Sequence, residues 1–165
     1  SLAEKAGVSI GSLYQYFPNK ESILVPVIRS FRNQHNKILI KQFRMAAEQA
    51  TDARQLTYAI VDYTADFFLE RPKYILNIYE RVGPLNLEKI IFDAREEVRV
   101  VLKEFMSKFF PKATEDEIEK SSFVVANAVP GVIQPYLLGY GKNINKEDLK
   151  SELRLLVWNY LSKYL

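Results

Sequence analysis

Apolar residues recur every three or four positions along most of the chain, which is the spacing of amphipathic helices. One long stripe spans residues 87–109 and stops before Pro111. Another spans about 20–47, where Asn19 is placed as the N-cap. No segment alternates apolar and polar residues as a half-buried strand does, so the sequence predicts an all-α fold.

Two shorter helices are expected between these stripes. Asp52 is placed to cap the first, which should end before Pro72. The second covers about 73–82 and is expected to end at Gly83-Pro84, because glycine and proline together usually break a helix.

Two further helices are expected in the last third of the chain. Thr114 and Glu117 have the spacing of a capping box, which opens a helix over about 114–139. Asn145 is placed to cap the last helix. The apolar face of that last helix is expected to carry Leu149, Leu153, Leu156, Tyr160 and Tyr164.

Residues 121–141 carry no charge and approach the length of a membrane-spanning helix. Pro130, Gly131 and Pro135 lie within this segment, so a buried interface helix is favoured over a membrane helix. The two prolines are expected to kink the helix and to free backbone carbonyls that could line a pocket.

Composition excludes several kinds of chemistry. The chain of 165 residues has no cysteine and one histidine, which leaves too few ligands for a zinc centre and too few partners for a Ser-His hydrolase. No catalytic residue, metal or cofactor is therefore assigned, and an all-helical enzyme is the weaker alternative throughout. With 48% hydrophobic and 26% charged residues, the chain has the composition of a globular protein.

Positive charge is concentrated at the N-terminal end. Residues 1–46 hold seven basic and two acidic side chains, whereas the other 119 residues hold 16 basic and 18 acidic ones. A basic head on a nearly neutral body is typical of a segment that meets a polyanion, although a solvated helix face has the same composition.

The first twenty residues have the pattern of two short helices joined by a turn. The first helix should end near Ala6, Gly7 can adopt the positive φ of the turn, and Ser9 is placed to cap the second helix. This is the arrangement of a helix-turn-helix. The residues expected to face inward are Val8, Leu13 and Phe17.

The opposite side of the second short helix is expected to face outward. Its residues suit a DNA major groove, because glutamine can pair with base edges, isoleucine can touch a thymine methyl, and hydroxyls can bind phosphates. The backbone amides that follow Pro18, together with Lys20, could hold a further phosphate. The alternative is a helical hairpin whose tyrosines pack against the body. The outward residues are Ile10, Ser12, Tyr14, Gln15 and Tyr16.

The run AEKAGVSIGSLYQYFPNKESIL closely resembles the signature of the TetR (tetracycline repressor) family of transcription regulators. Ile23 stands where leucine is usual in that signature. The resemblance covers about the first 24 residues directly. The matching residues include Ala3, Ala6, Gly7, Val8, Ser9, Gly11, Ser12, Leu13, Tyr14, Tyr16, Phe17, Lys20 and Glu21.

The resemblance implies DNA-binding roles for individual residues. Tyr14, Tyr16 and Lys20 would contact phosphates, and Gly11 would be small to permit close approach. The positions that would read or approach bases are Ile10, Ser12 and Gln15, beside the cap Ser9. Family members carry a complete first helix and most of a second before this motif, so the DNA-binding head is expected to be incomplete in this sequence.

The resemblance also implies an architecture and a function. Residues 1–46 would form the DNA-binding head with its connecting helix, and residues 47–165 a body that binds a small, mostly apolar organic ligand and forms a homodimer through the last two helices. The implied protein is a cytoplasmic bacterial or archaeal repressor that leaves double-stranded operator DNA when the ligand binds. A helical ligand- or partner-binding module without DNA binding is the alternative. The candidate pocket residues are Tyr58, Phe67, Phe68, Tyr74, Ile78, Phe92, Phe105, Phe123, Asn127 and Gln134.

Overall fold

The structure, a computed structural model, describes residues 2–85 and 87–165. For Leu2, Lys20, Glu21, Tyr74, Tyr79 and residues 81–85 only the backbone is described. Within these ranges the secondary structure is helical, which confirms the predicted all-α fold. The helices are α1 (Leu2–Lys5), α2 (Ile10–Tyr16), α3 (Lys20–Gln49), α4 (Ala53–Leu69), α5 (Pro72–Leu85), α6 (Glu88–Phe109), α7 (Glu115–Leu137) and α8 (Lys146–Leu161), followed by a 3-10 turn at Ser162–Tyr164.

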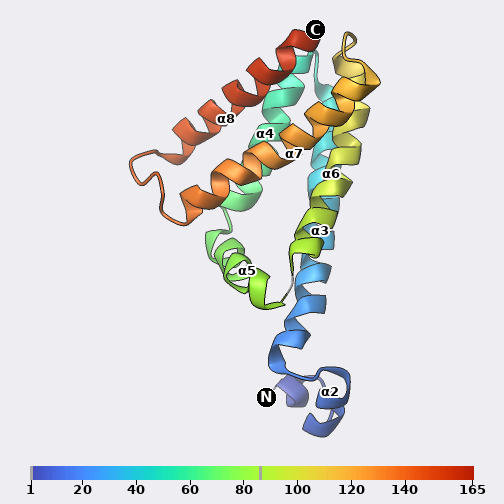
Figure 1. The fold of residues 1–165 in the computed structure, drawn as a ribbon, viewed down its shortest axis with the longest axis vertical. Coiled ribbons are helices and arrows are strands. Elements are labelled where there is room, and N and C mark those ends of the chain that lie inside the picture. Colours follow the sequence, from blue (N-terminus) through green and yellow to red (C-terminus); the bar gives the residue numbers. More distant parts are fainter. Residues whose placement is uncertain (1, 86) are drawn as a thin grey trace.

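A small head and a larger helical body are joined by α3 (Figure 1). The short helices α1 and α2 lie at the N-terminal end of α3, and the rest of α3 packs against α4 and α6. In the body α6 packs on α7, and α4 packs on both α7 and α8. The body core is apolar and includes the fully buried Phe43, Leu56, Val61, Ile133 and Leu153.

The N-caps predicted for α3, α4, α7 and α8 are confirmed, and each side-chain oxygen accepts a hydrogen bond from the backbone amide three residues later. These bonds fix where the helices begin, because they satisfy amides that have no partner inside the helix. The donor–acceptor distances are 2.7 Å for Ser22 to Asn19, 2.8 Å for Gln55 to Asp52, 3.3 Å for Glu117 to Thr114 and 2.9 Å for Asp148 to Asn145.

Two details of the helix predictions are wrong. Helix α5 continues through Gly83-Pro84 to Leu85, since a proline in the last turn of a helix removes only one amide donor there. In α8, Leu156 is exposed, and the buried stripe continues through Val157 and Leu161 instead. Helix α7 runs as one element through Pro130 and Pro135, and the kink expected at these residues stays a prediction.

Replacing Thr114 with alanine should lower the free energy of unfolding by about 1 kcal/mol, because its hydroxyl caps α7. The backbone amide and hydroxyl of Thr114 donate to Glu117 and lower the pKa of that carboxyl. Stability from the ionised Glu117 is therefore present above its ordinary pKa and is lost as the pH falls through the lowered value.

Chemical denaturation at neutral and acidic pH tests this prediction. The Thr114→Ala deficit should shrink in acid, and Thr114→Ser should retain wild-type stability, because serine supplies the same hydroxyl. A deficit of equal size in the serine variant would contradict the capping explanation.

Candidate nucleic-acid interface and body cavities

The turn between α1 and α2 is built around Gly7. Its φ is +66°, a left-handed conformation that side chains disfavour. The amide of Gly7 donates to Glu4 O at 3.1 Å and the amide of Val8 donates to Ala3 O at 3.0 Å, which closes the end of α1. No atom lies within 4 Å of a Cβ placed on Gly7, so the backbone conformation is what requires glycine here.

Ser9 begins the second helix of the motif, as predicted. Its Oγ accepts a hydrogen bond from the Ser12 amide at 3.0 Å, and its carbonyl accepts one from the Leu13 amide at 3.0 Å. The two serine hydroxyls also lie 2.8 Å apart. Two short helices with a glycine turn between them form a helix-turn-helix, the motif predicted from the sequence.

The candidate DNA-contacting side of α2 is open to solvent. Ile10, Tyr14 and Tyr16 are 61%, 51% and 81% exposed, and Ser9, Gly11, Ser12 and Gln15 are exposed as well. Leu13 and Phe17 are half-buried, in line with their predicted inward positions. Val8 was expected to face inward but is 45% exposed, because it lies in the turn and not on a helix face.

The capped N-terminus of α3 follows α2 directly in the chain. The Asn19 side chain accepts from the Ser22 amide, and the Ser22 hydroxyl donates to the Asn19 carbonyl at 2.7 Å. The N-terminal end of the 30-residue α3 therefore lies next to α2, and helix N-termini attract anions. The side chain of Lys20 lies outside the described part of the chain.

This head has the arrangement of a helix-turn-helix, a motif found in many DNA-binding proteins. Residues 1–27, which include α1, α2 and the first turns of α3, match the family model described as bacterial regulatory proteins, tetR family. The match supports a DNA-binding transcription regulator of the tetR family, and the all-helical structure agrees with it. No curated protein matches the chain.

None of the helices in the described ranges has the length and hydropathy needed to cross a membrane. The part of α7 that carries no charge, from Ser121 onward, instead buries Val125, Ala126, Val129 and Ile133 inside the body. That half of its surface is part of the core formed with α4, α6 and α8.

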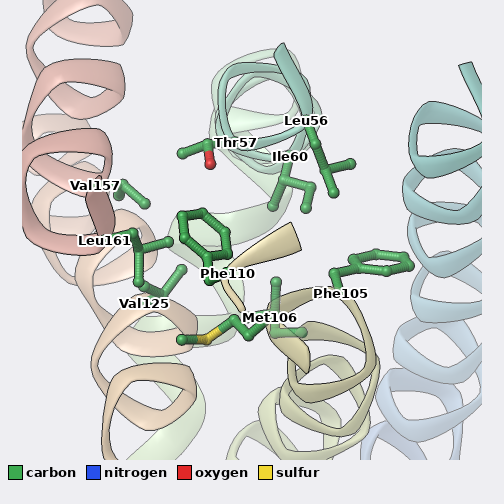
Figure 2. Close-up of a pocket in the computed structure, with 10 residues that line it drawn as sticks. Leu56, Thr57, Ile60, Phe105, Met106, Phe110, Val125, Val157 and Leu161 are labelled. Atoms are coloured by element: carbon green, nitrogen blue, oxygen red, sulfur yellow. The ribbon is translucent and has the colours of Figure 1, made fainter. Parts of the chain in front are cut away.

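The body holds an apolar gap between α4, α6, α7 and α8, shown in Figure 2. Its volume is about 20 Å³, enough for roughly one water molecule. Phe105, one of the predicted pocket residues, lines it. The polar side chain in its lining, Thr57, donates to Ala53 O at 2.7 Å and is satisfied within its own helix. This gap therefore offers a ligand no polar recognition.

A second cavity, between α3, α4, α6 and α7, has a different lining. Its volume is about 40 Å³, and Phe67 and Phe68 line it as predicted. Arg32, Asn36 and Arg95 also line it and were missed from the sequence. The sequence spacing could have indicated two of these three residues. Arg32 and Asn36 follow Ile28 at four-residue steps on the face of α3 that is buried in the body.

A hollow of about 250 Å³ lies between α3 and α4. Phe67 and Leu39 line both this hollow and the 40 Å³ cavity. The ring of Phe67 stacks edge-on against Phe68 at 5.0 Å between centroids and lies 5.6 Å from the ring of His35.

The other predicted pocket residues are dispersed. Ile78 and Phe68 line a small gap of about 10 Å³ next to Arg32. Phe92 and Phe123 are 57% and 60% exposed. Asn127 accepts a hydrogen bond from Arg95 at 2.9 Å. Tyr58 and Gln134 are half-buried, and the side chain of Tyr74 lies outside the described part of the chain.

Proposed function

We propose that this chain is a ligand-responsive repressor that binds operator DNA through α2. The observation that carries the proposal is that α2 has no buried residue, although two tyrosines and an isoleucine lie on it. These exposed side chains do not contribute to a hydrophobic core, whereas their hydroxyl and apolar groups suit contacts in a DNA major groove. Tyr14, Tyr16 and Lys20 would bind phosphates.

Base recognition would come from the rest of the same face. The Gln15 amide can bond to an adenine edge, Ser12 can bond to a base or a phosphate, and Ile10 can contact a thymine methyl. Ser9 starts the helix and Gly11 leaves room for the DNA backbone. This arrangement supports direct reading of a short half-site.

A homodimer would place two such heads on one operator. Helix α7 exposes Val124, Gly131 and Val132, which lie on one side of the helix because they are seven or eight residues apart. Helix α8 exposes Leu155 and Leu156. Two copies joined through these helices would form a four-helix interface, with the heads in successive major grooves.

Ligand binding would act through α3, which belongs to both the head, residues 1–46, and the body, residues 47–165. A small, mostly apolar molecule in the body would favour a conformation in which the heads no longer match the operator spacing. The protein would work in the cytoplasm of a bacterium or archaeon. A helical binding module without DNA binding is the alternative, and operator selection separates the two.

Selection of bound sequences from a random duplex library tests the proposal. The intact protein should enrich a near-palindromic site. Gln15→Ala should relax the preference at one or two positions in each half-site, at about 1–3 kcal/mol each. Lys20→Ala should weaken binding to all sequences and reduce the slope of log affinity against log salt by about one.

Tyr140→Phe is the matched control for Tyr14→Phe, because Tyr140 is 74% exposed in the loop after α7, away from the head. Tyr14→Phe should weaken DNA binding and Tyr140→Phe should leave it unchanged. If Gln15→Ala selects the same operator with the same stringency, the assignment of Gln15 fails. If the intact protein enriches no sequence, the repressor proposal fails.

A further inference from the structure

The buried face of α3 is polar between two hydrophobic clusters. Toward the head, Ile28 belongs to a small cluster with residues of α5 and of the start of α6. Toward the C-terminal end of α3, Leu39 and Phe43 belong to the main body core. Arg32 and Asn36 lie between them, and each is only 9% exposed. Among the described residues, the two clusters are therefore separated on α3 by buried polar side chains.

Helix α6 is divided at the same level. Ile91 belongs to the small cluster and Leu102 to the main core, whereas the buried Ala94 belongs to neither. Both clusters hold α3 against α6 through apolar contacts, one on each side of this polar level. We call the contact between Asn36 of α3 and Ala94 and Glu97 of α6 the seam.

Asn36 crosses the seam with two hydrogen bonds. Its Nδ2 donates to the backbone carbonyl of Ala94 at 2.7 Å and to Glu97 Oε2 at 2.9 Å. Apolar contacts hold helices together but are non-directional, so they fix the register weakly. A hydrogen bond requires a narrow range of distance and angle, so a bond to one backbone carbonyl fixes where α3 lies along α6.

Another polar contact between these two helices is much weaker. Arg44 and Glu104 lie 3.6 Å apart, and more than half of each side chain is exposed. Exposed ion pairs contribute little, because both side chains are long, mobile and hydrated. Of these two contacts, the buried one at Asn36 is therefore the one that can fix the register.

A small movement at the seam is amplified at the head. Residues 20–36 of α3 span about 24 Å at the rise of an α-helix. A tilt of about 10° at Asn36 would therefore displace the start of α3 by about 4 Å. Successive base pairs are about 3.4 Å apart, so this displacement is enough to change the half-site spacing that a dimer matches.

We propose that Asn36 is a positioning residue whose bonds across the seam set the direction of α3 on α6 and thereby the spacing of the two heads. This inference rests on the proposed function, because head spacing has a meaning only for a dimer on an operator. Asn36 would act through α3 and would not itself contact DNA.

Asn36→Leu tests the inference, since leucine has a similar shape but cannot donate, and the exposed Glu97 can bind water instead. The chain has no cysteine, so Lys5→Cys on α1 and Val100→Cys on α6 give unique sites for spin labels. Double electron–electron resonance on labelled chains, diluted with excess unlabelled chain, measures the distance within one chain. In the Asn36→Leu protein this distance should shift, or its distribution broaden, by about 4 Å, as a tilt of about 10° requires.

Binding to operators of different spacing is the second measurement. The site selected from the random library is compared with versions whose half-sites are one or two base pairs farther apart. The wild-type protein should prefer the selected spacing by at least about tenfold, and Asn36→Leu should reduce this preference below about threefold. The midpoint of urea denaturation should stay close to that of the wild type. A merely structural role would instead weaken binding to all spacings equally.

Asn77→Leu is the matched control. Asn77 is exposed on α5, and its side chain donates to Lys73 O at 2.7 Å within the same helix. This variant should leave both the distance and the spacing preference unchanged. If Asn36→Leu does not fold, Asn36→Ser replaces it, because the serine hydroxyl is too short to reach Ala94 O. If neither variant folds, Asn36 is a structural residue and the inference fails.

The distance measurement is independent of DNA. A protein that enriches an operator but keeps its head-to-body distance or its spacing preference in the Asn36 variants would refute only this inference. A protein whose head-to-body distance depends on Asn36 but which enriches no DNA sequence would refute the proposed repressor and leave the register bond at the seam standing.

Discussion

Replacing Phe43 with alanine is expected to lower the free energy of unfolding by about 3–5 kcal/mol. Phe43 lies on α3, is 0% exposed and belongs to the main body core. The substitution removes a whole ring from a packed interior, and the surrounding helices can fill the space only in part. Domains are typically stable by only about 5–15 kcal/mol, so this loss would leave the body marginally folded.

Urea denaturation followed by circular dichroism measures the effect. Met45→Ala is the matched control, because Met45 lies two residues along the same helix and is 48% exposed. Its change should stay within about 0.5 kcal/mol, as is usual at exposed sites. Similar losses for the two variants would mean that helix propensity, and not burial in the core, decides the stability of α3.

The sequence was sufficient to predict the helices because their ends are local features. Asn19, Asp52, Thr114 and Asn145 each cap a helix through an oxygen three residues from its donor, so no distant contact is needed to place them. The turn at Gly7 is local for the same reason. The helix-turn-helix could therefore be predicted from about twenty residues.

Packing between helices was less accessible to sequence reasoning. The apolar face of α8 was placed through Leu156, whereas Val157 is buried and Leu156 is exposed. Both residues are apolar and adjacent, and only the position of α4 against α8 decides which one is covered. Apolar periodicity gives the width of a stripe but not its centre.

The predicted pocket residues do not line one common cavity, for a related reason. Aromatic residues were chosen because pockets are apolar, but Phe105, Phe67 and Phe92 lie in a packing gap, in a cavity wall and on the exposed surface. Arg32 and Asn36, which line the same cavity as Phe67, are polar residues in an apolar stripe of α3 and were not chosen. Polar groups are costly to bury without partners, and a sequence does not show which of them find partners inside the core.

Leu156→Glu is expected to convert the proposed dimer into a monomer. Leu156 is 50% exposed on α8, on the surface through which two copies are proposed to pack. Burying a carboxylate there costs at least about 2 kcal/mol. In a two-fold interface the change occurs in both copies, so the dimer should lose at least about 4 kcal/mol, which is roughly a thousandfold in its dissociation constant.

Sedimentation velocity measures the result directly, because the mass should fall from twice 19.1 kDa to 19.1 kDa. Met45→Glu serves as the control for the charge itself, since Met45 is equally apolar and 48% exposed but lies on α3. That variant should remain dimeric, and circular dichroism should show both variants folded. The Leu156→Glu monomer should also bind an operator at least tenfold more weakly, because only one head can engage at a time. A Leu156→Glu protein that stays dimeric would place the interface elsewhere than on α8.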